Sequence, residues 1–400
     1  MNRKKSAALL LAAVMIAAML MTGQENAYAL RYESFLDADA MFTERDMLQN
    51  PDVSDAVPID VTDGAQIALT EGGTYLLGGT ASDALIIVDA PEDAKVQLVL
   101  DGLTLTNSSL PCIYVKSADK VFLTVQGENT LRVNGELVSD GSARIDGAVF
   151  SRSDLVLNGT GTLNVSSTAH GIVSKDDLKI TGGNFYISAA SHGIEANDSI
   201  RIAGGNIALA VGRDGLHAEN DEDNSLGYLF ISGGTLIVNA ADDGLHAKSA
   251  LEIDGGDFTI NAAEGLESTR IQLNGGTISI QSWDDGINAA YKTGNERPLL
   301  EINGGEITIT MAAGDTDGVD SNGDLRINGG TISVTGSSTF DVDGSIEFNG
   351  GTVFVNGQQV SSIPNQMMGG RGGFGGGWGS FGEQGNSGWG GFGRGGWHGW

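Results

Sequence analysis

The stretch that decides the fold is a repeat, seen in LEIDGGDFTINAAEGLES at residues 251–268 and in IQLNGGTISIQSWDDGINA at residues 271–289. Each copy has a short apolar alternation, a Gly-Gly pair, a second alternation, and then an acidic residue or histidine before Gly and an aliphatic residue. Nine copies begin between residues 155 and 346, at spacings of 20 to 29 residues. A period in this range is typical of a solenoid, in which each repeat packs on its neighbours.

The alternation within each copy predicts β-strands with one buried face. A helix is excluded because each Gly of the Gly-Gly pair would cost about 1 kcal/mol in a helix interior. The Gly pairs, often preceded by Asn, suit the left-handed backbone of tight corners, so each copy predicts three short strands. Weaker copies begin near Ile67, Val96 and Val121. We therefore predict an all-β fold, a right-handed single-stranded parallel β-helix of about twelve coils.

The two ends of the chain differ in composition from the repeats. A basic start, an apolar run over residues 7–21 and Ala27-Tyr28-Ala29 predict a cleaved secretory signal. An uncleaved membrane anchor is the alternative, but about 15 apolar residues are short for a bilayer. The predicted segments are a signal peptide (1–29), an amphipathic N-terminal cap over the first coil (30–66), the β-helix (67–360) and a disordered tail rich in Gly, Trp and Phe (361–400).

The charge of the chain is strongly negative, with 51 acidic residues against 22 Lys and Arg and a formal net charge of −29. Nucleic acids and anionic membranes need clustered basic residues, so neither is an expected partner. A compact body with this many carboxylates favours bound cations. Cys112 is the sole cysteine and rules out an intrachain disulfide. We expect a secreted, extracellular monomer without a membrane span in its mature form.

Equivalent positions of successive coils stack in a β-helix, so each repeat position becomes a column. The residue before the Gly of the third turn forms column 1: His170, His192, Asp214, Asp243, Glu264, Asp285 and Asp317. Three residues further on, column 2 holds Val173, Glu195, His217, His246, Glu267, Asn288 and Asp320. Neighbouring carboxylate columns repel each other unless a cation lies between them.

Calcium fits these columns, because it binds six to eight oxygen atoms from carboxylates, amides and carbonyls. We therefore predict several Ca²⁺ ions. Turn preference alone explains Asp before Gly, but it does not explain the second acidic column. A transition-metal site at His217 and His246 is an alternative, although the sequence offers no obvious third ligand. The predicted metal ligands are Asp214, Asp242, Asp243, Glu264, Glu267, Asp284, Asp285, Asn288, Asp315, Asp317 and Asp320, with Glu195 as a further candidate.

The signal sequence, the INGGxxxI strands and the turns at residues 242–245 and 284–287, which read DDGL and DDGI, carry a resemblance. In these features the chain resembles a family of secreted bacterial carbohydrate-binding parallel β-helix proteins, over roughly residues 50 to 360. These proteins are built like pectate lyases and bind cellulose and acidic pectic polysaccharide with calcium. The resemblance implies an extracellular, calcium-dependent, non-catalytic polysaccharide binder, but it does not identify the sugar.

Two repeats carry extra residues after their third strand, Glu219 to Tyr228 and Ala290 to Leu299. They are candidates to wall a groove above the acidic edge, although solenoids also tolerate insertions that have no function. A second, hydroxyl-rich face that includes Tyr186 is another surface for a polymer chain, and ordinary solvent-facing strands share its composition. The predicted carbohydrate-binding residues are the aromatic ones nearest the groove, Tyr228, Trp283 and Tyr291.

Enzyme alternatives remain open at this point. A calcium-dependent pectate lyase needs a basic residue beside the metal, and Arg213 is the candidate. A polygalacturonase-like hydrolase needs paired Asp followed by His-Gly, but here both His-Gly pairs, at His170 and His192, precede the paired Asp. Because the acids recur in coil after coil, ion binding is favoured and no catalytic residue is predicted. A structural surface adhesin is the third possibility.

Overall fold

The computed structural model describes residues 33–365, apart from residues 140, 142, 143 and 315. Within this part of the chain the ordered elements are 36 β-strands and one 3-10 helix, η1 (Ala38–Ala40). No helix among them is long and apolar enough to cross a membrane. The predicted all-β fold with parallel strands is confirmed, because the strands form a 24-stranded and a 12-stranded sheet in which only β35 and β36 pair antiparallel among the described residues. The predicted signal peptide lies outside the described residues, as does the tail beyond residue 365.

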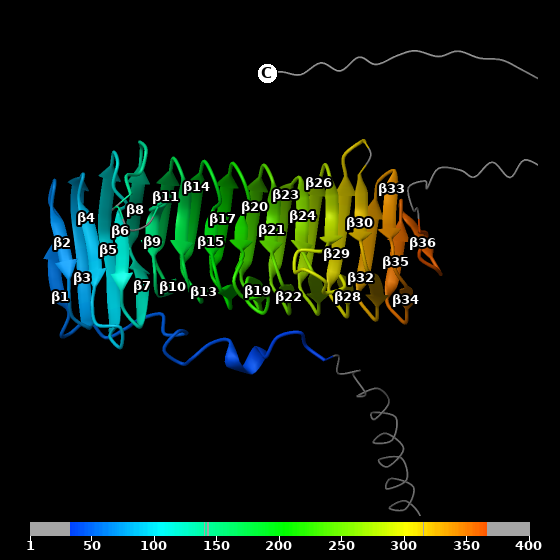
Figure 1. Ribbon diagram of the computed structural model, residues 1–400, viewed down its shortest axis with the longest axis horizontal. Coiled ribbons are helices and arrows are strands. Elements are labelled where there is room, and N and C mark those ends of the chain that lie inside the picture. The colour runs from blue at the N-terminus through cyan, green and yellow to red at the C-terminus, as the bar shows by residue number, and fades with distance from the viewer. Residues whose placement is uncertain (1–32, 140, 142–143, 315, 366–400) are drawn as a thin grey trace, which may run out of the picture. The chain divides into compact units, whose positions relative to one another are not determined.

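Each repeat contributes one strand to each of three ladders, and successive repeats lie side by side (Figure 1). Ladder 1 contains β1 (Val57–Asp60), β3 (Gly73–Ser82), β5 (Lys95–Asn107), β7 (Lys120–Gln126), β10 (Asp154–Gly159), β13 (Asp177–Ile180), β16 (Ser199–Ile202), β19 (Tyr228–Ile231), β22 (Ala250–Ile253), β25 (Arg270–Leu273), β28 (Leu299–Ile302), β31 (Asp324–Ile327) and β34 (Ile346–Phe348). Ladder 2 contains β8 (Glu128–Val133), β11 (Thr162–Ser167), β14 (Asn184–Ala189), β17 (Asn206–Val211), β20 (Thr235–Ala240), β23 (Asp257–Ala262), β26 (Thr277–Ser282), β29 (Glu306–Met311), β32 (Thr331–Thr335), β35 (Thr352–Val355) and β36 (Gln358–Val360).

Ladder 3 is the 12-stranded sheet, and it carries columns 1 and 2. The long strands β3 and β5 extend across both other ladders and join them into the 24-stranded sheet. Ladder 3 contains β2 (Gln66–Leu69), β4 (Leu85–Asp89), β6 (Ile113–Ser117), β9 (Gly147–Ser151), β12 (His170–Ser174), β15 (Ile194–Ala196), β18 (Leu216–Ala218), β21 (Asp243–Ala247), β24 (Glu264–Ser268), β27 (Asp285–Ala289), β30 (Asp317–Ser321) and β33 (Ser338–Val342).

The corner between ladders 1 and 2 explains the Gly-Gly pair. Gly256, the second glycine of its pair, has φ of +114°, which disfavours any residue with a side chain. A Cβ on Gly255, the first glycine, would lie 3.0 Å from the carbonyl oxygen of Ser232 in the preceding repeat. One glycine is therefore required by its backbone conformation and the other by the close approach of a neighbouring strand.

The asparagines before the Gly-Gly pairs form a ladder of their own. The left-handed backbone belongs to the glycines, as predicted. Nδ2 of Asn303 donates to Oδ1 of Asn274 at 2.8 Å, and Asn328 and Asn349 repeat this bond along the corner. The amide ladder satisfies side-chain donors and acceptors in register with the strands, so it helps to fix the pairing of successive repeats.

The N-terminal segment differs from the predicted cap. Strand β1 already begins at Val57 within the predicted cap region, and residues 33–56, called the strap here, lie along the outer face of ladder 1 (Figure 1). The backbone N–H of Leu36 donates to Glu252 at 2.9 Å, while Gln49 donates to the carbonyl oxygen of Thr181 at 3.1 Å. The strap follows the ladder because its apolar and charged side chains meet the outward side chains of several repeats, rather than the end of the first one.

The outward column of ladder 1 is buried where the strap covers it, whereas the side chains of Arg326 and Glu347 further along are 42% and 50% exposed. Lys179 and Glu252 are 5% and 0% exposed. Asp46 of the strap, itself fully buried, lies 3.0 Å from Nζ of Lys179 and 3.6 Å from Nζ of Lys120. Phe42 packs against Phe230 with ring centroids 6.3 Å apart. Charge pairing under the strap makes this column a structural element.

The last repeat is covered by residues that follow it. Strand β36 pairs antiparallel with β35 along its free edge. The side chain of Asn365 bonds both the backbone N–H and the carbonyl oxygen of Val342, at 3.0 and 2.9 Å. These contacts satisfy part of a strand edge that would otherwise be open to pairing with another chain.

Candidate functional site

Columns 1 and 2 lie on the outer face of ladder 3 in the register that the repeat predicts. Strand pairing aligns Asp243 with Glu264 in column 1 and His246 with Glu267 in column 2. The glycine after each column 1 residue allows the strands to approach, because a Cβ on Gly244 would lie 2.6 Å from the carbonyl oxygen of Gly265. The sequence therefore places the side chains of successive repeats directly beside one another.

The chemistry of the columns changes along the ladder. Column 2 begins with Tyr114, Phe150 and Val173, which form a small buried apolar cluster. The middle repeats pair a histidine in one column with a carboxylate in the other, beginning with His192 and Glu195 in one repeat. The later repeats carry carboxylates and Asn288 alone.

The four histidines of the columns form a continuous stack. Ring centroids are 5.0 Å apart for His170 and His192, 4.3 Å for His192 and His217, and 4.8 Å for His217 and His246. Oδ2 of Asp214 lies 2.6 Å from Nδ1 of His217 and 3.1 Å from Nδ1 of His192. Burial alone would raise the pKa of Asp214, but hydrogen bonds from both imidazoles outweigh burial and hold that pKa well below its usual value.

His246 lies between two carboxylates. Its Nδ1 is 2.8 Å from Oδ2 of Asp243 and 2.8 Å from Oε2 of Glu267. Burial lowers the pKa of His246, but the two carboxylates reverse this effect and raise the pKa to about 10. Burial would raise the pKa of Glu267, whereas His246 and Lys292 lower it to about 2. The charged imidazolium thus compensates the carboxylates of Asp243 and Glu267.

The later repeats lack such compensation. Burial, together with repulsion from Glu267, raises the pKa of Glu264 to about 8. Burial and the charge of Asp320 raise the pKa of Asp285 to about 7, and Asp320 itself reaches about 6. Asn288 is 8% exposed, and its buried Oδ1 has no hydrogen-bond donor. These four side chains present oxygen atoms that are short of positive charge, and we call them the acidic end.

The structure places most of the predicted metal ligands in the two columns and the others outside them. Asp214, Asp243, Glu264 and Glu267 belong to groups whose ligand atoms lie within 4.8 Å of one another. Asp285, Asn288, Asp317 and Asp320 continue the same columns in register. Asp242 and Asp284 are exposed and lie in the turns that immediately precede β21 and β27, so they adjoin the columns without being part of them. Asp315 lies outside the described residues.

Sequence reasoning left the histidines outside the predicted ligand set. Three of the groups with ligand atoms within 4.8 Å contain a histidine: His170, His192 and Glu195; His192, Asp214 and His217; and Asp214, Asp243 and His246. His217 and His246 fall in different groups, which share the carboxylate of Asp214. The sequence does indicate these histidines as candidate ligands, since each of His192, His217 and His246 shares its repeat with an acid in the other column.

The inserted segments lie beside the columns. A pocket of about 420 Å³ opens between the first insertion and column 2, lined by Lys175, Glu195, His217, Glu219 and residues 220–222 among others. Nζ of Lys248 holds this insertion through Asp221 at 2.8 Å. The second insertion brings Lys292 into an ion pair with Glu267. Both insertions therefore supply walls or charges to the candidate site.

The comparison with known families supports a carbohydrate-binding role. Residues 63–316 and 267–361 match the family of carbohydrate-binding domain-containing proteins, and the two matches together span most of the chain. The chain belongs to this family. A carbohydrate-binding domain-containing protein from Acetivibrio thermocellus is 33% identical over 141 residues, which are 33% of this chain and 49% of the relative. The chain therefore spans about half the length of that relative.

A solved structure is also similar to this carbohydrate-binding family member. It is a polysaccharide lyase-like protein from C. thermocellum, determined as a gadolinium derivative. The likeness has a TM-score of 0.51 and 30% sequence identity, and covers 56% of this chain and 96% of the other. A member of a carbohydrate-binding family is thus similar to a solved protein that is described as polysaccharide lyase-like.

The three predicted carbohydrate-binding residues of this family member lie in different places. Tyr228 begins β19 in ladder 1, beneath the guanidinium of Arg201 at 5.3 Å from the ring centroid. Trp283, 45% exposed, precedes β27 and lines a shallow pocket of about 300 Å³. Tyr291, 55% exposed, follows the other end of β27. Only Trp283 adjoins the outer face of ladder 2.

The outer face of ladder 2 carries two uncharged columns across eight strands, β11 to β32, which we call the uncharged face. Its exposed apolar side chains, Tyr186 and Ile237, line a shallow depression of about 350 Å³. A third outward column of the same ladder contains the exposed carboxylates of Asp257 and Glu306, so the uncharged face consists of these two columns alone. The face consists of Asn164, Tyr186, Ala208, Ile237, Thr259, Ser279, Thr308 and Ser333 in one column, and Ser166, Ser188, Ala210, Asn239, Asn261, Gln281, Thr310 and Thr335 in the other.

Proposed function

We propose that this member of the carbohydrate-binding family is a secreted, calcium-stabilised polysaccharide-binding protein without catalytic activity, built as a right-handed solenoid of about twelve coils. The solenoid is supported by the twelve strands of ladder 3, each of which pairs in parallel with the strand of the next repeat. Secretion is supported by the N-terminal sequence, which has the basic, apolar and small-residue regions of a signal peptide.

The observation that carries the binding proposal is the uncharged face. A neutral polysaccharide offers hydroxyl groups and flat apolar ring faces, which match hydroxyl and amide side chains around exposed aromatic and aliphatic ones. Tyr186, Ile237 and Trp283 are among the few large apolar side chains that remain exposed, and all three lie on or beside this face. An extended polymer of the cellulose type fits a flat surface of this kind, and pectic polysaccharide remains the other candidate.

Calcium fits the acidic end. The side chains of Glu264, Asp285, Asn288 and Asp320 offer oxygen atoms as ligands, and Oδ1 of Asn288 is buried without a donor, while its Nδ2 donates to Oε2 of Glu264 at 2.9 Å. These are the hard ligands that calcium prefers. The ion would supply positive charge that neutralises the columns, and so stabilise ladder 3.

The absence of catalysis is supported by the arrangement of the candidate catalytic groups. In the pair Asp242 and Asp243, the side chain of Asp242 is exposed. The side chain of Asp243, which belongs to column 1, is bonded to His246. Such a pair does not present two carboxylates to one glycosidic bond, as hydrolases require. Arg213, the candidate base of a lyase, is exposed beside Asp214, whose carboxylate is already bonded to two imidazoles.

Substitutions on the uncharged face test the binding proposal. We expect Tyr186→Ser and Trp283→Ser each to weaken binding to insoluble cellulose about tenfold, because each removes an exposed apolar ring worth about 1.4 kcal/mol. Depletion isotherms with the full chain measure the effect.

Tyr291→Ser is the matched comparison, since it removes an equally exposed tyrosine at the far end of β27. If Tyr291→Ser weakens binding and Tyr186→Ser does not, the polymer lies in the groove between the inserted segments and the proposed face is wrong.

A further inference from the structure

We propose that the histidine stretch of columns 1 and 2 is a binding site for a transition-metal dication of the zinc type, distinct from calcium at the acidic end. The stretch comprises His170, His192, Glu195, Asp214, His217 and Asp243, with His246 at its boundary. A metal site here is separate from polysaccharide binding, because it has another ligand and is formed by other residues.

The donor set is the first argument. His192, Asp214 and His217 bring two imidazoles and one carboxylate together, with ligand atoms within 4.8 Å of one another. Zinc binds imidazole nitrogen and carboxylate oxygen at about 2.0 to 2.2 Å, so donors a few ångströms apart need only small shifts to reach one ion. Calcium is a poor match here, because it prefers oxygen to imidazole nitrogen.

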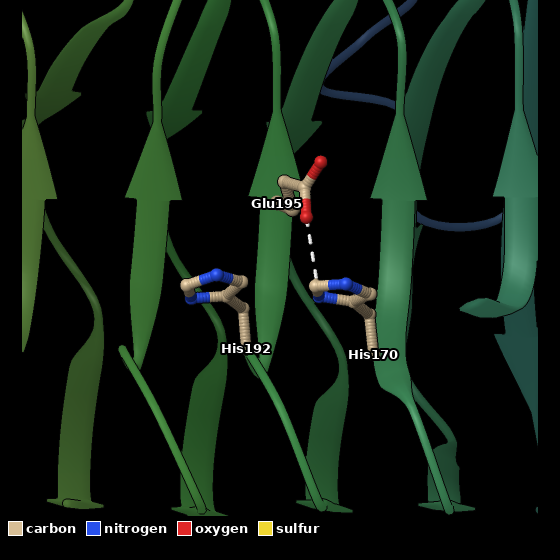
Figure 2. A group of neighbouring side chains, drawn as sticks. All are labelled: His170, His192 and Glu195. Atoms are coloured by element: carbon tan, nitrogen blue, oxygen red, sulfur yellow. Dashed lines mark ion pairs between the residues drawn. The ribbon is translucent and has the colours of Figure 1, made fainter. Parts of the chain in front are cut away.

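The group in Figure 2 adds an independent observation. Nδ1 of His170 lies 3.1 Å from Oε2 of Glu195, and the ring of His192 stacks beside it. That nitrogen is buried and forms no hydrogen bond, and the dashed line in Figure 2 marks its ion pair with Glu195. The other carboxylate oxygen of Glu195, Oε1, accepts from Nζ of Lys175 at 2.7 Å. A cation at this position would take Nδ1 of His170 and Oε2 of Glu195 as ligands.

The surroundings of His217 resemble those of a metal ligand. Its Nδ1 lies 2.6 Å from Asp214, and its Nε2 lies 3.3 Å from Oε2 of Glu219 in the first insertion. A histidine that binds a metal through one nitrogen usually donates the other N–H to a carboxylate, which fixes the ring. His217 has a carboxylate at each nitrogen. A metal ion bound at one nitrogen would replace one of these contacts, and the other carboxylate would orient the ring.

The histidine stack repeats this combination of donors. Four imidazole rings lie at centroid distances of 4.3 to 5.0 Å. Each ring has a carboxylate oxygen within 3.1 Å of its Nδ1. The stretch therefore brings nitrogen and oxygen ligands together in successive repeats.

Zinc titration of the full chain in excess calcium tests the proposal. We expect isothermal titration calorimetry to detect zinc binding that calcium does not displace, and His217→Gln to weaken it at least about tenfold. Asp285→Asn is the matched control at the acidic end, and it should leave zinc affinity unchanged while reducing the stabilisation by calcium.

A second readout does not depend on a folded variant. Electron paramagnetic resonance of Cu²⁺ bound to the unsubstituted chain should show coupling to nitrogen nuclei, since imidazole is the ligand. A copper signal with oxygen ligands alone, zinc that calcium displaces, or equal zinc affinity in a folded His217→Gln chain would overturn the proposal. None of these results bears on polysaccharide binding or on calcium stabilisation, which have their own measurements.

Discussion

At pH 8, calcium should raise the melting temperature of the protein by roughly 5 °C or more, and at pH 5 by much less. The reason lies in the acidic end. Burial and neighbouring carboxylates raise the pKa of Glu264 to about 8, of Asp285 to about 7 and of Asp320 to about 6. In the unfolded chain these groups titrate near 4.

The sign of the pH dependence follows from these shifts. A carboxyl whose pKa is raised on folding contributes stability that is fully present below its unfolded pKa, near pH 4, and that is lost as the pH rises through 6 to 8. The metal-free protein should therefore melt at a lower temperature at pH 8 than at pH 5. Bound calcium replaces the lost protons as the source of positive charge, so it should remove most of this difference. Calorimetry at both pH values, with calcium or with a chelator, measures it.

Two variants control this result. Asp285→Asn combined with Asp320→Asn removes repulsion and ligands together, so the metal-free chain should be more stable at pH 8 and should gain little from calcium. Asp257→Asn, an exposed residue on the outer face of ladder 2, should behave as the unsubstituted chain. If calcium raises the melting temperature of the double variant as much as that of the unsubstituted chain, the ion binds elsewhere. If calcium does not raise the melting temperature of the unsubstituted chain, the calcium proposal is wrong.

The strap gives the second large expected effect. We expect Asp46→Ala to destabilise the protein by about 3 to 5 kcal/mol, because it leaves the buried ammonium of Lys179 without its carboxylate. Burial would raise the pKa of Asp46, but the backbone N–H of Thr43 and the ammonium of Lys179 hold it below its usual value. Chemical unfolding and limited proteolysis within residues 33–56 measure the loss.

Asp52→Ala is the control for the strap, since Asp52 lies in the same segment and is exposed. Its effect should stay within about 0.5 kcal/mol. Equal stability and equal resistance to protease in the Asp46 and Asp52 variants would show that the charge pair under the strap contributes nothing.

The columns were predictable because they follow from the period of the repeat. Once one copy aligns with the next, Glu264 must lie beside Asp243, and the strands pair in this register. The period does not decide the role of Asp242 and Asp284. Both are exposed in the turn immediately before β21 and β27, beside the columns rather than in them, and their part in metal binding stays a prediction.

The strap was not predictable from the repeat, because its contacts have no period. Asp46 and Lys179 are 133 residues apart, and nothing in either sequence neighbourhood specifies the other. The pairing of Asp214 with His192 and His217 is intermediate: the register was available from sequence, but the bonding of one carboxylate to two rings depends on side-chain geometry.

Retention of the purified chain on insoluble polysaccharide, with product formation followed in the same tubes, tests the central claim most directly. We predict retention on cellulose or on pectic polysaccharide in calcium, with neither new reducing ends nor unsaturated product. Failure to bind any polysaccharide would contradict the proposed function. Product release that Arg213→Ala abolishes would show instead that the protein is a lyase.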